Sequence, residues 1–261
     1  MYPPLVSIIV ANFNKAQYLS RCLDSLIGQT YEHIEIILVD DCSTDESFKI
    51  ATDYAKRFNN IRIIKNLVNV GVAASRNIGI LQAQGEYVST LDSDDEYCPE
   101  KIEREMHVLG QYSSANVVAY SDIVIKDEGK GCLSHPIEYP TEGDAHKAIL
   151  FRKGPIPRDM LIPISLLKGM ELWFDREIPM FEDWDFKIRL LSRASLRYSG
   201  VVGIIYHQQS TGLSRGPLLR AIYWLWIVFR KNSSYSNKIV MLFGFLGLLV
   251  NMIVFKTKVI K

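Results

Sequence analysis

Three carboxylates lie within four positions of one another at the end of an apolar segment. Asp92, Asp94 and Asp95 directly follow the segment from Tyr87 to Leu91. Negative charges this close repel one another unless a cation lies among them. Carboxylate oxygens, with no His or Cys beside them, are the ligands that Mg2+ and Mn2+ prefer. The sequence therefore predicts a divalent cation, Mn2+ or Mg2+, at this turn.

Two further acidic pairs, Asp40-Asp41 and Glu182-Asp183, begin segments with helical character. The first pair ends another apolar segment, and it either binds a ligand or leads into a helix capped by Ser43 or Thr44. Glu182 and Asp183 precede apolar residues at helical spacing. Taken alone, they are explained as acids that the helix dipole favours in a first turn. Neither acidic pair can therefore be assigned a binding or catalytic role from its own residues alone.

The elements that must position these acids alternate along the first hundred residues. Four short apolar segments have the character of buried parallel strands, and they are 5–11, 34–39, 61–64 and 87–91. The segments between them are long enough for crossover helices, and they are 15–29, 44–58 and 72–84. Alternation of this kind predicts an α/β fold with a doubly wound, mostly parallel, Rossmann-like sheet. Ligands bind such sheets at the carboxyl ends of the strands, where the acids stand.

In this order and spacing, four motifs resemble those of family 2 glycosyltransferases, which have the GT-A fold. The matching stretches are Val6-Ser7-Ile8-Ile9-Val10-Ala11-Asn12-Phe13-Asn14, Leu38-Val39-Asp40-Asp41-Cys42-Ser43-Thr44-Asp45, Asn69-Val70-Gly71-Val72-Ala73-Ala74-Ser75-Arg76-Asn77-Ile78-Gly79 and Leu91-Asp92-Ser93-Asp94-Asp95. Each motif is weak by itself, but four in order make a specific signal. The resemblance extends from about residue 5 to about residue 215.

The resemblance implies a site for a UDP-sugar donor. By carry-over, Asp41 binds the uracil ring, Asp92 binds the ribose, and Asp94 ligates a metal ion that bridges the two phosphates. Four further residues belong to the same donor site: Ala11, Phe13, Arg76 and Ser93. Phe13 keeps an aromatic ring for stacking on the base, although the tyrosine and threonine hydroxyls usual in the family are absent. For Arg76, a contact with the base and a salt bridge to one of the aspartates both stay open.

The Glu-Asp motif of the family carries over to Glu182 and Asp183. There the aspartate is the general base, so the resemblance implies that Asp183 takes the proton from an acceptor hydroxyl and that the anomeric centre is inverted. A strand is expected over 196–206. His207 and Gln208 follow where Arg and His are usual, so His207 either contacts a phosphate or metal or is merely exposed. No Gln-x-x-Arg-Trp sequence occurs, which argues against a processive synthase.

Composition and charge differ between the body of the chain and its C-terminal end. A 261-residue chain with 48% hydrophobic residues can bury a large core, and four scattered Cys without a C-x-x-C pair indicate neither a zinc site nor a disulfide scaffold. The residues up to Asp185 carry 18 basic and 29 acidic side chains, a net charge of −11, and no acid follows Asp185. The C-terminal segments 218–229 and 239–255 are hydrophobic with basic flanks. They predict an amphipathic membrane anchor, with a true transmembrane span and a dimer or core helix as alternatives.

From these features we expect three parts: a nucleotide-sugar-binding half over 1–112, an acceptor-binding half of the same GT-A domain over 113–215, and a membrane-associating tail over 216–261. The N-terminus has no basic region of a signal peptide, so the expected location is the cytoplasmic face of the inner membrane. The expected partners are a UDP-sugar, a lipid-linked saccharide and the membrane surface, and no nucleic acid.

The function implied is transfer of one hexose to a hydroxyl of a lipid-linked saccharide in surface polysaccharide synthesis, such as O-antigen, capsule or lipooligosaccharide, with formation of a β-glycosidic bond. The alternatives are a polyprenyl-phosphate sugar synthase and a non-catalytic membrane-bound scaffold. Intact Asp94 and Asp183 argue against the scaffold. A nucleotidyltransferase is disfavoured because no glycine-rich phosphate loop follows the first strand.

Overall fold

A computed structural model describes residues 3–114, 116–127, 131–132, 141–153, 157–208, 218–233 and 238–259. Of residues 131–132, 238 and 252–259 it describes the backbone only. The expected boundary at 215/216 and the side chains of the basic residues beyond Asn251 lie outside the described residues.

The main sheet has five strands in the order β3-β2-β1-β4-β8, of which the first four are parallel and β8 is antiparallel. Its strands are β1 Val6–Asn12, β2 Ile34–Asp40, β3 Ile61–Lys65, β4 Tyr87–Asp92 and β8 Ile162–Pro163. The side chains of β1 and β2 are almost all buried, as their continuous apolar runs require. The prediction of a doubly wound, mostly parallel sheet is confirmed.

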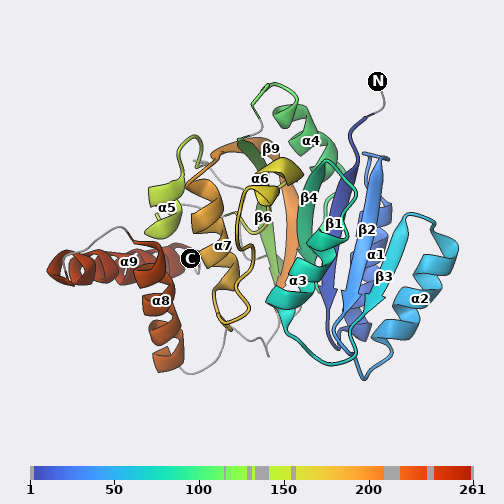
Figure 1. The fold of residues 1–261 in the computed structure, drawn as a ribbon, viewed down its shortest axis with the longest axis horizontal. Coiled ribbons are helices and arrows are strands. Elements are labelled where there is room, and N and C mark those ends of the chain that lie inside the picture. The colour runs from blue at the N-terminus through green and yellow to red at the C-terminus, as the bar shows by residue number, and fades with distance from the viewer. Residues whose placement is uncertain are drawn as a thin grey trace.

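Crossover helices cover both faces of this sheet (Figure 1). The first four helices are α1 Ala16–Ile27, α2 Ser47–Arg57, α3 Val72–Leu81 and α4 Lys101–Leu109. One buried cluster joins α1, α2 and α4 to residues such as Ile8 and Ile36, and a second joins α3 to Ile9 and Ile37. Adjacent strand residues therefore point into opposite cores, which is the alternation of a strand covered on both faces.

A smaller sheet carries the second half of the chain, with strand order β5-β9-β6-β7. Its strands are β5 Glu96–Tyr97, β6 Val117–Asp127, β7 Gly131–Cys132 and β9 Ser195–Gln208. The helices of this half are α5 His146–Leu150, α6 Ile164–Lys168 and α7 Glu182–Leu191. The strand expected over 196–206 and the helix expected near Asp183 are thus confirmed. Because β8 pairs with β4, the second half is joined directly to the main sheet.

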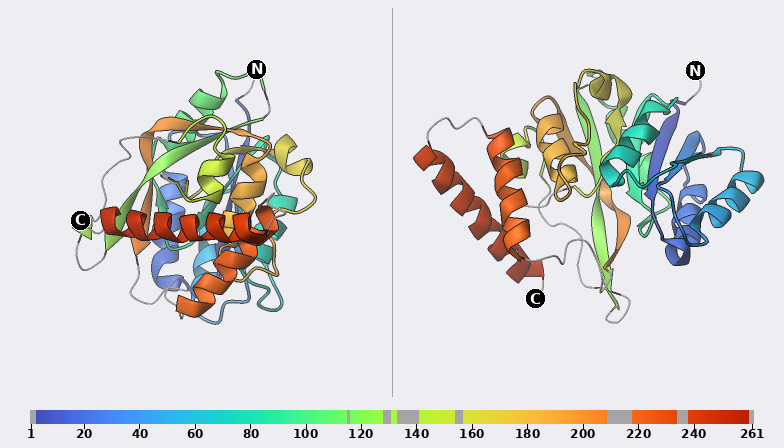
Figure 2. Two further views of the ribbon diagram at one scale, coloured as in Figure 1. Left: turned by 90° about the vertical axis from the view of Figure 1, so that its left-hand side faces the viewer. Right: turned by 60° about the horizontal axis from the view of Figure 1, so that its bottom comes forward.

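The hydrophobic C-terminal segment forms two helices, α8 Leu218–Asn232 and α9 Lys238–Val259. Figures 1 and 2 show them at the end of the molecule opposite α2, beyond α7. Five of their apolar side chains are buried in the same cluster as α7: Leu225, Val228, Phe229, Phe245 and Leu248. No helix in the described part of the chain is both long enough and apolar enough to cross a membrane. The tail is therefore packed against the second half of the chain rather than set apart from it.

Candidate active site

The parallel strands bring the predicted acids to one edge of the main sheet. In the register of β1, Asn12 pairs with Asp40 of β2 and Ala11 pairs with Asp92 of β4. The loops after β1, β2 and β4 consequently leave the sheet side by side. The convergence expected from the sequence is confirmed.

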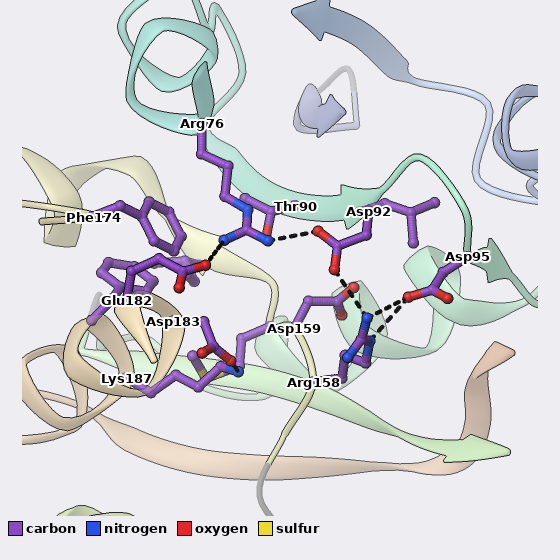
Figure 3. A pocket seen from close by; sticks show the side chains of 14 residues that line it. Arg76, Thr90, Asp92, Asp95, Arg158, Asp159, Phe174, Glu182, Asp183 and Lys187 are labelled. Carbon is purple, nitrogen blue, oxygen red and sulfur yellow. Dashed lines mark hydrogen bonds and ion pairs between the residues drawn. The ribbon is translucent and has the colours of Figure 1, made fainter. Parts of the chain in front are cut away.

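A cavity of about 190 Å³ opens beside the end of β4. Figure 3 shows that its charged side chains come from α3, from the end of β4, from the segment before β8 and from the start of α7. The residues that line it are Arg76, Thr90, Leu91, Asp92, Asp95, Arg158, Asp159, Met160, Ile162, Phe174, Glu182, Asp183, Phe186 and Lys187. Of the predicted site residues, Arg76, Asp92 and Asp183 meet here.

Arg76 joins the donor edge to the helix of the Glu-Asp motif. Its guanidinium donates from Nη2 to Asp92 Oδ1 at 2.6 Å and from Nη1 to Glu182 Oε1 at 2.9 Å (Figure 3). The Phe174 ring lies 5.1 Å from the guanidinium carbon, within the range of a cation–π contact. The salt-bridge alternative for Arg76 is therefore confirmed, and one side chain connects residues that lie 90 positions apart in the chain.

Arg158 supplies a second cation that the sequence analysis missed. It donates from Nη2 to Asp92 Oδ2 at 2.9 Å and to Asp95 Oδ2 at 2.7 Å, and its guanidinium carbon lies 3.9 Å from the centre of the Tyr206 ring. Burial would raise the pKa of Asp92, but Arg76 and Arg158 outweigh it and lower that pKa. Burial raises the pKa of Asp95 to about 7 in spite of Arg158. The sequence feature that could have indicated Arg158 is its position in a charged pair, Arg158-Asp159, just before an apolar segment.

Asp94 differs from its neighbours because its partner is a lysine. Lys15 Nζ lies 2.6 Å from Asp94 Oδ2, and their side chains are 30% and 20% exposed. The repulsion that predicted a metal is thus relieved by the chain's own cations, and the described residues contain no group of three His, Cys, Asp or Glu side chains arranged for a metal. Mg2+ is nevertheless commonly held by one or two carboxylates together with substrate phosphates. Asp94 fits such a role because its partner is the single ammonium group of Lys15. A metal ion displaces such a group from a carboxylate more readily than it displaces an arginine held by two hydrogen bonds.

The first turn of α7 presents Glu182 and Asp183 to the cavity. Phe181, just before the helix, has a left-handed backbone with φ 67°, which is a costly conformation for a residue other than glycine. Asp183 Oδ2 accepts a hydrogen bond from Lys187 Nζ, one turn later, at 2.7 Å. Burial would raise the pKa of Asp183, but Lys187 outweighs it and holds that pKa well below the usual range. Asp183 is therefore ionised, as a proton acceptor must be.

The other predicted donor residues lie near the sheet edge but do not line this cavity. Ala11 is in β1, Phe13 is 44% exposed in the loop after it, and Ser93 is buried. Asp41 is also buried, and its carboxylate accepts hydrogen bonds from the backbone N–H groups of Val70 and Gly71 and from Asn66 Nδ2. In this structure Asp41 fixes the loop that leads into α3.

Two of the alternatives left open by the sequence are wrong. Helix α2 is not capped by Ser43 or Thr44: it begins at Ser47, whose N–H donates to Asp45 Oδ1 at 2.9 Å. His207 is not exposed but 2% accessible, with Nε2 2.6 Å from Glu96 Oε1 and its backbone N–H bound to Asp95. The pairing of β5 with β9 brings Glu96 to His207, and nothing in the spacing of the sequence predicts that pairing.

A buried ionic cluster supports the floor of the cavity. Lys101 Nζ lies 2.8 Å from Glu105 Oε2 and 3.2 Å from Asp159 Oδ1, and all three side chains are at most 5% exposed. Glu105 also accepts a hydrogen bond from Ser121. These contacts tie the segment that carries Arg158 and Asp159 to α4.

Comparisons with known proteins agree on one family. The sequence profile described as "Glycosyl transferase family 2" matches residues 7–156. An uncharacterized glycosyltransferase of Rickettsia typhi is 30% identical over 83% of this chain and 69% of its own length. One of Rickettsia bellii is 30% identical over 76% of this chain, but the chain spans only 29% of that protein. Crystal structures of S. aureus TarS 1-349 have the same fold: the one in complex with UDP-GlcNAc has a TM-score of 0.72 at 21% identity, over 96% of this chain and 73% of that one.

Proposed function

The chain belongs to glycosyltransferase family 2, and from that premise we propose that it moves one hexose from a UDP-sugar to a hydroxyl of a lipid-linked saccharide, with inversion to a β-glycosidic bond. The observation that carries the proposal is the cavity itself. Asp92, from the donor edge, and Asp183, from the Glu-Asp motif, line the same cavity. That is the arrangement that transfer between a bound donor and a bound acceptor requires.

In the proposed reaction, the Asp183 carboxylate takes the proton of the acceptor hydroxyl while the hydroxyl oxygen attacks C1 of the sugar. The bond from C1 to the diphosphate breaks on the opposite face, and UDP departs with the bonding electrons. The configuration at C1 is therefore inverted. Lys187 keeps Asp183 ionised for this step, and Arg76 holds Glu182 and Asp92 on either side of the sugar.

The donor's diphosphate needs compensation of charge as it leaves. A bound Mn2+ or Mg2+ held by Asp94 would supply Lewis-acid chemistry at that point. Lys15, which pairs with Asp94 in the structure, is a second positive charge at the same place. The TarS structures with UDP and with UDP-GlcNAc support a UDP-sugar as the donor class.

The lipid-linked acceptor and the place of action rest on the tail. A row of apolar side chains on α9 is exposed, including Leu242, Phe243, Leu246 and Val250, and Arg220 is exposed near the start of α8. An exposed apolar face on one helix and an exposed basic side chain on the other suit an interfacial anchor on anionic lipid. We therefore propose that the protein acts at the cytoplasmic face of the inner membrane in surface polysaccharide synthesis.

A donor screen tests the function most directly. The full chain is incubated with a panel of UDP-sugars and with saccharide-diphosphate lipid or undecaprenyl phosphate in parallel, and released UDP is measured. We expect release with the saccharide lipid and one preferred UDP-hexose. Release with undecaprenyl phosphate alone would instead identify a polyprenyl-phosphate sugar synthase, and no release with any pair would contradict the proposal.

Flotation with lipid vesicles tests the anchor. The full chain should float with vesicles that contain anionic lipid, and Phe243→Asp should weaken flotation because it places a charge on the apolar row. Leu67→Asp, at a 93% exposed position in the loop after β3, is the matched control. Equal flotation of both variants would refute the assignment of this face to lipid.

A further inference from the structure

The last turn of α8 contacts the catalytic helix at Asp185, two residues after the proposed base. Asn232 Nδ2 donates to Asp185 Oδ1 at 2.8 Å, and Lys231 Nζ lies 3.1 Å from the same oxygen. Asp185 is fully buried, so its charge depends on these partners and on Arg189, whose Nε donates to Asp185 Oδ2 at 2.9 Å. A buried carboxylate without its partners would be strongly unfavourable.

The same lysine also contacts the loop that carries Phe174, a residue of the cavity wall. Lys231 Nζ lies 2.7 Å from Asp175 Oδ2, in the loop between α6 and α7. Phe174, next to Asp175, lines the cavity, and its ring centre lies 4.4 Å from that of Phe186 on α7. One ammonium group of the tail therefore ties the loop of Phe174 to the helix of Asp183.

The start of α7 needs external support. Its first turn carries Glu182, Asp183 and Asp185, and it follows the strained backbone of Phe181. Each acid has a cation from a different source: Arg76 of α3 binds Glu182, Lys187 of α7 binds Asp183, and Lys231 of the tail binds Asp185 together with Arg189. Among the described residues of the tail, Lys231 is the one that binds both this turn and the loop, to which Arg189 of α7 also donates at the backbone carbonyls of Leu172 and Trp173.

We propose that Lys231 and Asn232 are positioning residues for the transfer reaction, through which the tail sets the place of Asp183 and Phe174. The inference rests on the proposed function, since it assigns these residues to the same site. It predicts that the tail is part of the catalytic unit and not only an anchor. A displacement of about 1 Å at a reacting group can cost about 100-fold in rate, so loss of one support should lower turnover measurably.

The test compares Lys231→Met with Arg230→Met, its exposed neighbour on the same turn, in the full chain. For each variant, the donor KM is measured, and kcat is expressed per donor-binding site counted by UDP titration. Lys231→Met should lower kcat by about tenfold with the donor KM within about twofold, and Arg230→Met should match the parent. Lys231→Arg, which keeps the charge, should restore most of the loss. Asn232→Ala removes a hydrogen bond to Asp185 but leaves the charges of Lys231 and Asp185 in place. It should lower kcat in the same way.

Hydrogen exchange gives a readout that does not depend on transfer. The amides of Ile178 and Asp185 donate to Asp175 and Phe181, and their exchange should be faster in Lys231→Met, while that of β1 and β2 stays unchanged. A purely structural role would lower the number of binding sites without changing kcat per site, and this result would overturn the inference. Equal kcat and equal exchange in Lys231→Met and Arg230→Met would overturn it as well. If the parent transfers no sugar, the proposed function fails, and the exchange comparison still decides whether the tail holds α7.

Discussion

Replacement of Arg76 by Met should weaken the fold and the site together, because one guanidinium spans two halves of the chain. Met keeps most of the apolar stem but removes both charged hydrogen bonds. Hydrogen bonds to charged groups contribute about 1.5–3 kcal/mol each. The bond to Glu182 should carry this full value, because the two side chains are only 10% and 13% exposed.

The bond to Asp92 should contribute less, about 1 kcal/mol. Asp92 is 34% exposed, so solvent screens it, and Arg158 remains as its partner. We therefore expect Arg76→Met to lower the free energy of unfolding by about 3 kcal/mol, which agrees with the about 3–5 kcal/mol found when one partner of a buried ion pair is removed. Lys56→Met, which breaks an exposed pair with Asp53, should change it by about 0.5 kcal/mol or less.

Both contributions can be measured by urea unfolding of Arg76→Met, Glu182→Gln, Asp92→Asn and the two double variants that combine Arg76→Met with each of the others. The comparison gives one coupling free energy for each pair. The coupling of Arg76 with Glu182 should exceed its coupling with Asp92. A stability loss below about 1 kcal/mol for Arg76→Met, or the reverse order of the two couplings, would show that the free energies assigned to the two hydrogen bonds of Arg76 are wrong.

Three further outcomes are expected of the same site. Asp183→Asn keeps the shape of the first helical turn but cannot accept a proton, so kcat should fall by roughly 100-fold or more with donor affinity little changed; a near-normal kcat would move the base elsewhere. Lys187→Met removes the largest of the cationic effects that lower the pKa of Asp183 and leaves those of Arg76 and Arg152, so the pKa should rise and activity should be lost at a higher pH on acidification; an unmoved pH profile would contradict the ion-pair argument. Asp94→Ala and EDTA should each abolish transfer, with Mn2+ or Mg2+ restoring the EDTA-treated enzyme; full turnover without metal would reject the metal role of Asp94.

The first four strands of the main sheet and the helices between them could be predicted because each depends on local pattern, whereas the short β8 was missed. The apolar runs that became β1 to β4 are bounded by polar turns, and the helices between them repeat apolar residues at helical spacing. The carboxyl-end location of the acids then follows from parallel connection alone. Errors appear where local pattern does not decide the outcome, as at the start of α2, which Asp45 rather than Ser43 or Thr44 stabilises.

The pairs within the site could not be predicted in the same way. The argument for a cation among Asp92, Asp94 and Asp95 was physically sound, but it could not tell a metal from an arginine elsewhere in the chain. Arg158 lies more than sixty positions beyond these acids and reaches them only because β8 pairs with β4. Spacing predicts neighbours along an element, whereas this contact depends on the pairing of two strands that lie far apart in the chain.

The contacts of the tail could not be predicted from composition either, and they affect the function proposed for it. Composition marked it as an appendage, since it is apolar, basic and free of acids, and an anchor of that kind could be removed without harm to the catalytic half. The structure buries Phe229 and Phe245 against that half and sets Lys231 on Asp185. The proposed lipid-binding surface and the proposed support of the catalytic helix are then parts of the same two helices. On these two proposals, removal of α8 and α9 should impair transfer as well as attachment, even with an acceptor that needs no membrane.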